Sequence, residues 1–152
     1  MDKTIVTALL IIAGVVSAVL VFNAIFPAIS QSSDAMSSMQ RRIDERMQSQ
    51  IEIIHATRSG SDVLIWVKNV GSLRIAPPEA SDLFFGPDNN FVRIPYNSGS
   101  PNWTYVLEND TEWRAGATLR MVVHFAVPPA AGTYFVKVVL PNGISDEIFV
   151  SW

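Results

Sequence analysis

Apolar residues dominate the first part of the chain and then recur at helical spacing. No charged residue occurs from Thr4 to Ser33, and the apolar stretch Ile5–Phe26 reaches the length of about 20 residues that crosses a hydrocarbon core. The later apolar positions, three, four or seven residues apart, are Ile29, Met36, Met39, Ile43, Met47, Ile51 and Ile54. This spacing is typical of one helical face. It predicts a helix from about Thr4 to Gln48, bent at Pro27, which lacks a backbone donor.

The period changes to two near Ile51, where Ile51, Ile53, His55 and Thr57 alternate with Glu52, Ile54 and Ala56. Alternation of this kind predicts strands. Further strands are expected at Val63–Lys68, Leu73–Ile75, Leu83–Phe85, Phe91–Ile94, Trp103–Leu107, Thr118–Phe125, Tyr134–Leu140 and Ile144–Val150. Segments rich in Gly, Pro and Asn separate them, which is the chemistry of turns. The sharpest hairpin signal is Asn142-Gly143, which predicts a type I′ turn.

The order of elements predicts an α+β chain with two parts. Many short strands with no helix between them indicate an antiparallel, Ig-like β-sandwich. We therefore expect a hydrophobic N-terminal helix over residues 1–49 and a β-sandwich over residues 50–152.

The length of the apolar segment argues against a cleaved secretory signal, whose apolar core usually spans about 7–15 residues. Four small residues follow one another at helical spacing: Ala13, Gly14, Ser17 and Ala18. Such residues let helix backbones approach closely, although small residues are common in any membrane helix. The long amphipathic continuation favours a helix packed among copies of itself, because a monomeric anchor has no need of one.

Composition and charge exclude several classes of function. The net charge is −3 and basic residues do not cluster, so nucleic acid is not an expected partner. There is no cysteine, which removes disulfides and thiolate chemistry. His55 and His124 are the two histidines and lie far apart in the sequence, whereas zinc needs three or four ligands.

No catalytic pattern occurs either. The sequence contains no Gly-x-Ser-x-Gly elbow, no phosphate-binding glycine loop and no EF-hand calcium loop. We therefore predict no enzyme activity, no cofactor, no metal and no small-molecule substrate. An enzyme or a lectin on a sandwich scaffold stays open, because a fold alone does not exclude a function.

Two sequons for N-linked modification lie within ten residues of each other. They are Asn102-Trp103-Thr104 and Asn109-Asp110-Thr111, at the two ends of one predicted strand. Such modification needs Asn-x-Ser/Thr on an exposed segment of an exported protein. Asn102 and Asn109 are therefore candidate glycosylation sites.

The stretch VLIWVKNVGS (Val63–Ser72) resembles the archaellin family and its relatives in the archaellum machinery. In that group a strand runs into a Val-Lys-Asn-x-Gly-Ser turn, matched here by Val67, Lys68, Asn69, Gly71 and Ser72. The closing stretch AGTYFVKVVLPNGISDEIFVS is also similar. With the apolar helix, the resemblance covers nearly the whole chain in architecture.

The resemblance implies a class III prepilin-like subunit of a motility filament outside the cell, inserted in the membrane before assembly. Such a subunit forms a helical homopolymer with copies of itself. Its other partner is the archaellum assembly machinery in the membrane. The family also includes membrane-anchored accessory or stator proteins whose sandwich binds a cell-envelope component. The family's basic leader is not matched by Met1-Asp2-Lys3-Thr4, and the chain is short for an archaellin. Both points keep the accessory interpretation open.

Overall fold

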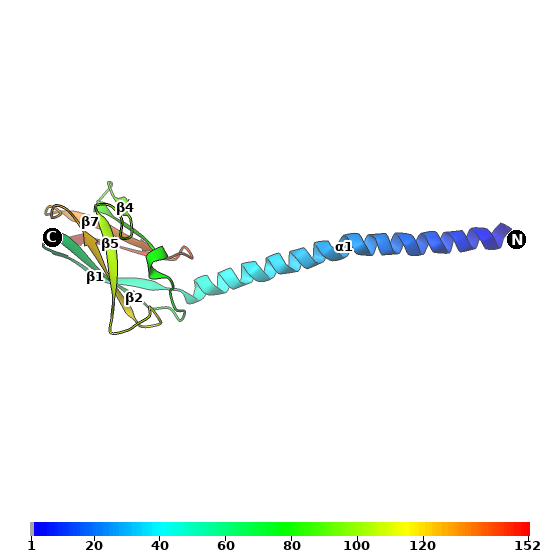
Figure 1. Cartoon of the computed structure of the whole chain (residues 1–152), viewed down its shortest axis with the longest axis horizontal. Coiled ribbons are helices and arrows are strands. Elements are labelled where there is room, and N and C mark those ends of the chain that lie inside the picture. Colours follow the sequence, from blue (N-terminus) through cyan, green and yellow to red (C-terminus); the bar gives the residue numbers. More distant parts are fainter. Residues whose placement is uncertain (1) are drawn as a thin grey trace. The chain divides into compact units, whose positions relative to one another are not determined.

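The computed structural model describes residues 2–152. Helix α1 runs over Asp2–Gln48 and continues through Pro27 without a break. The chain forms two compact units that meet between Arg42 and Ile43. The last turn of α1 thus belongs to the same unit as the strands, and the rest of the helix forms the other unit (Figure 1).

Within the described residues, α1 buries none of its side chains. Leu10, Phe22 and Ile29 are each more than 60% exposed, as are other large apolar side chains of α1. In water, exposed apolar surface costs about 25 cal/mol of free energy per Å². The helix is long and apolar enough to cross a membrane. Insertion into lipid satisfies the apolar side chains, while the helical hydrogen bonds satisfy the backbone.

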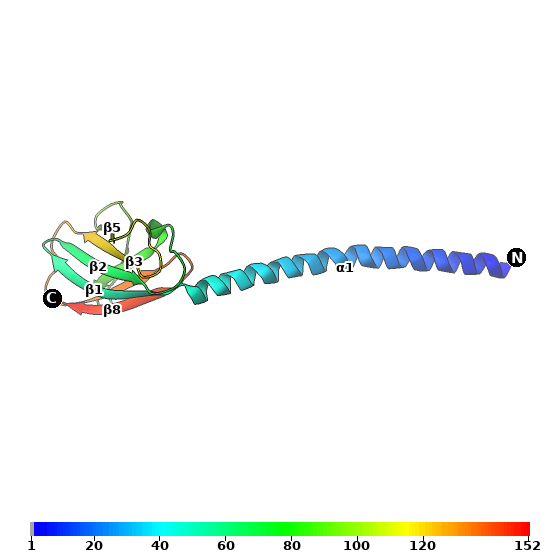
Figure 2. The ribbon, with the colours of Figure 1, turned by 90° about the horizontal axis from the view of Figure 1, so that it is seen from below.

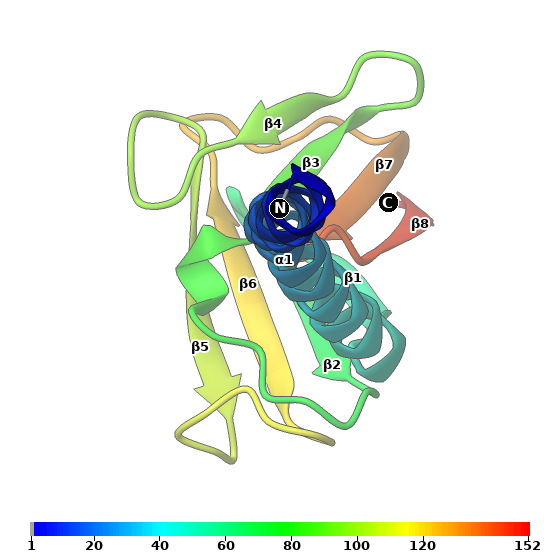
Figure 3. The ribbon, with the colours of Figure 1, turned by 90° about the vertical axis from the view of Figure 1, so that its right-hand side faces the viewer.

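The second unit is a sandwich of two four-stranded antiparallel sheets (Figures 2 and 3). The strands are β1 Ile51–Ser59, β2 Asp62–Asn69, β3 Asp82–Pro87, β4 Val92–Ile94, β5 Asn102–Glu108, β6 Thr118–His124, β7 Thr133–Val139 and β8 Ser145–Ser151. One sheet has the order β1-β2-β6-β5, which we call sheet A, and the other has the order β4-β3-β7-β8, which we call sheet B. The predicted fold class is confirmed.

The core lies between the sheets and is built by alternate residues of each strand. The fully buried side chains include Val63, Ile65 and Val67 of β2, which face Leu83 of β3 and Val136 of β7 across the sandwich interior. Burying one such side chain stabilises the fold by about 1.5–3 kcal/mol. Branched residues at every second position also suit a pleated strand, so the same pattern forms the strands and holds the sheets together.

The Val-Lys-Asn-x-Gly-Ser turn closes the junction between α1 and the sandwich. The N–H of Ser72 donates to Gln48 O at 2.9 Å, and the N–H of Gly71 donates to Gln50 O at 3.0 Å. A Cβ atom at Gly71 would lie 2.6 Å from Gln50 N and would also meet Gln48 O. Glycine is therefore required here by the close approach of two backbones.

Asn69 organises this turn from a fully buried position. Its Nδ2 atom donates to Leu73 O at 2.8 Å and to Trp113 O at 3.1 Å, while its Oδ1 atom accepts from Gly71 N at 3.0 Å. Gly71 N and Trp113 O also bond to backbone groups, so the Asn69 side chain takes the place of a strand partner above all for Leu73 O. The residues that carried the family resemblance form a structural joint.

The loop between β7 and β8 holds the other side of the joint. Arg46 Nε donates to Asn142 O at 2.9 Å, and Asn142 Nδ2 donates to Ser49 Oγ at 2.8 Å. The hairpin itself is not the predicted type I′ turn. Gly143 N donates to Leu140 O and Leu140 N to Ile144 O, and Gly143 has φ 85°. This is a three-residue loop with a bulge: Pro141 takes position i+1 of the turn that the Gly143 N–H closes, where the negative φ of proline is favoured.

Two further expectations about the strands are wrong. Leu73–Ile75 is not a strand, because the Leu73 carbonyl accepts from Asn69 and the Ile75 N–H donates to Trp113 O. The unbroken alternation expected for Ile51, Ile53 and His55 is also wrong, because the register of β1 shifts between Ile53 and His55. This bulge turns His55 to the exposed side, where it packs on Trp66 at a ring distance of 5.5 Å. The last two positions of the predicted helical stripe, at 51 and 54, lie in β1.

Candidate interaction surfaces

The predicted helix-packing residues all lie on α1. Ala13, Gly14, Ser17 and Ala18 are exposed, and a Cβ atom added at Gly14 would meet nothing within 4 Å. The helix backbone is therefore open to close approach at this point. Contact with another helix through these residues stays a prediction.

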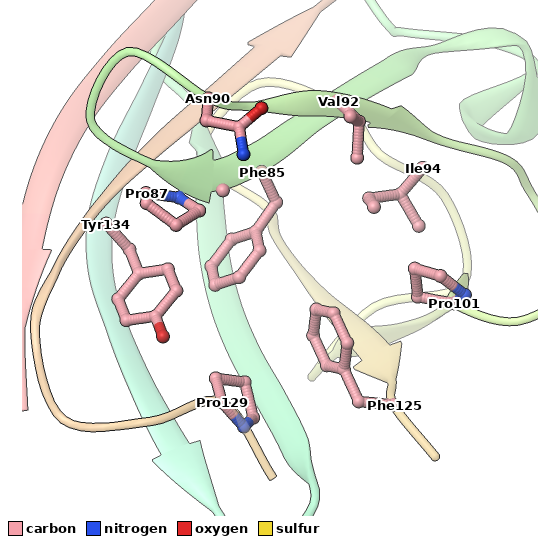
Figure 4. A pocket seen from close by; sticks show the side chains of 10 residues that line it. Phe85, Pro87, Asn90, Val92, Ile94, Pro101, Phe125, Pro129 and Tyr134 are labelled. Carbon is pink, nitrogen blue, oxygen red and sulfur yellow. The ribbon is translucent and has the colours of Figure 1, made fainter. Parts of the chain in front are cut away.

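The end of the sandwich opposite Gln48, which we call the distal end, contains an apolar cavity. Strand β6 finishes there, because β1 begins at the junction and β2 and β6 follow as antiparallel neighbours. Strand β3 also finishes there, because it runs antiparallel to β7, which leads into the Asn142 loop at the junction. The cavity has a volume of about 340 Å³ (Figure 4). Its lining comes from β3, β4, β7 and the adjoining loops: Phe85, Gly86, Pro87, Asn90, Val92, Ile94, Pro101, Phe125, Pro129 and Tyr134.

The cavity offers apolar surface and few polar groups. Among the lining residues, the Tyr134 hydroxyl already donates to Ala130 O at 3.0 Å, and the Asn90 amide is the other side-chain polar group. The lining carries no charged side chain. Such a site suits apolar or aromatic side chains of a partner, since ligand sites for polar molecules carry several placed polar groups.

A row of four phenylalanines, which we call the aromatic row, crosses the outer face of sheet B. Ring centroids are 6.4 Å apart for Phe84 and Phe91, 4.6 Å for Phe91 and Phe135, and 5.3 Å for Phe135 and Phe149. Phe91 reaches the row because Gly86 has no side chain: a Cβ atom there would lie 2.5 Å from Phe91 Cα. Phe91 is 46% exposed and Phe149 is 59% exposed.

The sequence indicates this row through pairs of adjacent bulky residues, which a search for alternating strands does not reveal. Adjacent bulky residues occur at Phe84-Phe85, Tyr134-Phe135 and Ile148-Phe149. Because successive strand residues point to opposite faces, one member of each pair must lie outside the core. Exposed aromatic groups that gather in this way mark interaction surfaces.

Three polar side chains are connected on the outer face of sheet A. Thr104 Oγ1 lies 3.0 Å from His124 Nε2, and His124 Nδ1 lies 3.2 Å from Asp62 Oδ1. The order hydroxyl, imidazole, carboxylate is that of a catalytic triad. The hydroxyl here belongs to the interior of a paired strand, and none of the three residues lines the cavity. The arrangement links strands β2, β5 and β6.

The two sequon asparagines have different surroundings. Asn102 begins β5 and is half-buried, with Nδ2 donating to Gly99 O at 2.6 Å. Asn109 follows β5, is exposed and has φ 58°. Within residues 2–152, no group of three or more His, Cys, Asp or Glu side chains is placed to hold a metal ion.

No family model matches the chain. An uncharacterized protein of Archaeoglobus fulgidus is 29% identical over 161 residues, covering 99% of this chain and 98% of that protein. The similarity therefore extends over the apolar helix as well as the sandwich.

Two solved structures from Sulfolobus acidocaldarius are similar in fold and sequence. The archaellum periplasmic stator protein FlaG is 28% identical with a TM-score of 0.61, over 67% of this chain and 99% of that chain. The archaellum periplasmic stator protein complex of FlaF and FlaG gives 28% identity and a TM-score of 0.60, over 66% of this chain and 88% of that one. These similarities support an archaellum-related family and do not single out archaellin.

Proposed function

We propose that this chain is a membrane-anchored accessory protein of an archaellum, of the stator type. The observation that carries the proposal is the likeness of the chain to FlaG, which is 28% identical and matches over 99% of the FlaG chain. Helix α1 supplies the anchor, because its apolar part is long enough to cross a membrane. The sandwich then lies outside the membrane, on the side where the archaellum filament emerges.

A stator needs a fixed attachment besides its anchor. A single helix in a fluid bilayer can rotate and diffuse, so it cannot resist torque alone. The sandwich must therefore bind a component that does not turn with the filament. The cavity and the aromatic row are the apolar surfaces available for this contact. Aromatic residues in a partly buried patch contribute most of the binding energy at many interfaces.

The partner we propose is another envelope protein of the FlaF type. FlaG occurs together with FlaF in one of the similar structures, which supports a heteromeric contact for the sandwich of this chain. The sandwich carries mixed, paired charges on sheet B, such as Arg93 with Asp82 and Lys137 with Glu147. Apolar area, and not a field of one sign, is thus the expected basis of recognition.

The filament interpretation predicts a different use of the same helix. A helix that exposes every side chain, with small residues beside Gly14, also suits a bundle of copies. Its sandwich would then form the surface of a homopolymer. The similar structures are stator proteins, so they favour the accessory role.

The two roles differ in where the protein is found. In cells that express the chain, quantitative mass spectrometry should find it in the membrane fraction and only in traces in sheared, purified filaments. A chain that is the main component of the filaments would disprove the proposal. Swimming should be lost on deletion of the gene and restored by the full chain, but not by an exported sandwich of residues 43–152 without the anchor.

A further inference from the structure

The two sequons differ in how accessible they are in the folded sandwich. We propose that Asn109 carries an N-linked saccharide and that Asn102 does not. The donor class is an oligosaccharide linked through phosphate to a membrane lipid, used by an oligosaccharide transferase outside the membrane. The inference rests on the proposed function in one respect, which is the placement of the sandwich on that side of the membrane.

The modification is a group transfer at the side-chain amide. A bond forms between Asn109 Nδ2 and C1 of the first sugar, and the bond between C1 and the phosphate oxygen of the lipid carrier breaks. One amide proton is released and the lipid phosphate leaves with the bonding electrons, so nothing is oxidised or reduced. The reaction therefore needs an Nδ2 atom and a Ser or Thr hydroxyl that the transferase can reach.

All three residues of the first sequon are occupied within the fold. Asn102 Nδ2 donates to Gly99 O at 2.6 Å, and Thr104 Oγ1 contacts His124 Nε2 at 3.0 Å. The residue between them, Trp103, is 0% exposed and belongs to the core. To bind in an enzyme groove, this segment would have to leave β5 and withdraw the tryptophan from the core, so the folded sandwich keeps the first sequon out of reach of the transferase.

The second sequon is open. Asn109 and Thr111 are exposed, and among residues 2–152 neither side chain has a hydrogen-bond partner. Asn109 has φ 58°, a left-handed conformation that Asn adopts more readily than most residues. The amide is therefore exposed on the loop that joins β5 to β6.

The aspartate inside the second sequon is held away from the asparagine. Asp110 Oδ1 accepts from Thr111 N at 2.7 Å, and Asp110 Oδ2 accepts from Arg114 Nε at 2.7 Å. Only 15% of the Asp110 side chain is exposed. Its negative charge is paired within the loop, so it does not stand beside the reacting amide.

The position of Asn109 is compatible with partner binding. Asn102 lies at the distal end and follows Pro101, which lines the cavity, so a saccharide there would stand at the cavity. Asn109 follows the opposite end of β5, which is a strand of sheet A, whereas the aromatic row lies on sheet B. A saccharide on Asn109 leaves both apolar surfaces free.

The test is peptide mapping by mass spectrometry of the full chain purified from cells that naturally express it. We expect a saccharide mass on the peptide that contains Asn109 and none on the peptide that contains Asn102. Asn109→Gly, which keeps the left-handed backbone, and Thr111→Ala should each remove the saccharide. Thr111→Ser and Asn102→Gln should each retain it.

A separate measurement reports the placement on which the inference rests. The chain has no cysteine, so Asn109→Cys creates a single thiol that a membrane-impermeant maleimide labels only from outside. Labelling in intact cells together with an unmodified Asn109 in the natural protein overturns the glycosylation and leaves the proposed placement standing. A saccharide on Asn102 also overturns the inference. Absence of labelling in intact cells, with labelling after lysis, overturns the placement and the inference with it.

Discussion

At the scale of single residues, the joint between helix and sandwich depends on one buried amide. Asn69 is fully buried and bonds to Leu73 O, Trp113 O and Gly71 N, of which the last two also have backbone partners. A buried backbone group that loses its partner costs about 1–3 kcal/mol. No other uncharged side chain of similar size donates twice and accepts once in this geometry.

Replacement of Asn69 by alanine should therefore lower the free energy of unfolding by roughly 2–4 kcal/mol. Urea denaturation of residues 43–152 measures it. The control is Asn142→Ala, whose half-buried side chain donates to Ser49 Oγ and accepts from Ile144 N, and for which we expect a smaller loss of about 1 kcal/mol. Equal losses in the two variants would show that burial of the amide has no special weight.

Gly71 and Gly132 give a matched pair for the close approach of backbones. An added Cβ atom at Gly71 meets three backbone atoms, whereas at Gly132 it meets Tyr134 Cε2 at 3.8 Å, which is ordinary contact. Gly71→Ala should cost about 3 kcal/mol, the upper part of the range for overpacking. Gly132→Ala should change stability by less than about 0.5 kcal/mol. Thermal melts of the two variants decide, and similar melting temperatures would contradict the prediction.

The hydrogen bond from Arg114 and that from the Thr111 N–H hold the pKa of Asp110 below its ordinary value of 3.8. Because the folded pKa is lowered, the contribution to stability is present above pH 3.8 and is lost as the pH falls through the folded pKa. A titration followed by NMR should show the low pKa, and Arg114→Gln should raise it. Arg74→Gln, which removes a different ion pair, should leave the pKa of Asp110 unchanged.

At the scale of elements, periodicity located the helix and every expected strand except one. Residues Leu73–Ile75 alternate between apolar and polar types, as a strand would. They form no strand because the buried Asn69 side chain already binds the Leu73 carbonyl. Sequence patterns record which faces are apolar, and they do not show where a distant side chain will take a backbone partner. The bulge after Ile53 escaped prediction for a similar reason, because the Ile53 N–H donates to the distant Asp146 carboxylate at 2.7 Å.

The apolar part of α1 should not tolerate charge. Val16→Lys places an ammonium near the middle of the segment, which costs about 2.5–3.5 kcal/mol at the centre of a membrane helix. We expect the variant to shift from the membrane pellet to the soluble fraction after alkaline extraction, with the β-type circular dichroism of the sandwich unchanged. Gly14→Leu adds apolar volume without charge and should stay in the pellet. Normal retention of Val16→Lys would mean that α1 is not the anchor.

At the scale of the whole molecule, the sandwich should fold without the apolar part of the helix. Residues 43–152 form one compact unit. We expect them to be soluble, to melt cooperatively and not to polymerise. The shorter segment 51–152 provides a direct comparison, because it lacks Arg46, Gln48 and Ser49. It loses several junction hydrogen bonds, each worth about 0.5–1.5 kcal/mol.

The shorter segment should therefore be less stable by roughly 2–4 kcal/mol, and its melting temperature should fall by about 10 °C or more. Differential scanning calorimetry measures both. If the two segments melt together, the junction contacts contribute nothing. Filaments formed by either segment would mean that the sandwich, and not the helix, carries polymerisation.

The candidate sites were only partly visible in the sequence. Asn102 and Asn109 share one motif, and only the fold shows that Trp103 ties the first to the core. The cavity joins residues of β3, β4 and β7 with the adjoining loops, so no local pattern could predict it. The aromatic row was marked by adjacent bulky residues, but which member of each pair lies outside depends on the register of sheet B.

The joint at Gln48 also has a mechanical consequence. Ser72 N and Leu73 N bond to Gln48 O, while Arg46 and Ser49 are held from the other side by Asn142. A force that pulls the last turn of the helix away from the strands must therefore break contacts with two separate loops, the one after β2 and the one between β7 and β8. Within residues 43–152, both loops therefore oppose rotation of residues 46–49 against the strands, whereas the helix before Ile43 forms a separate unit.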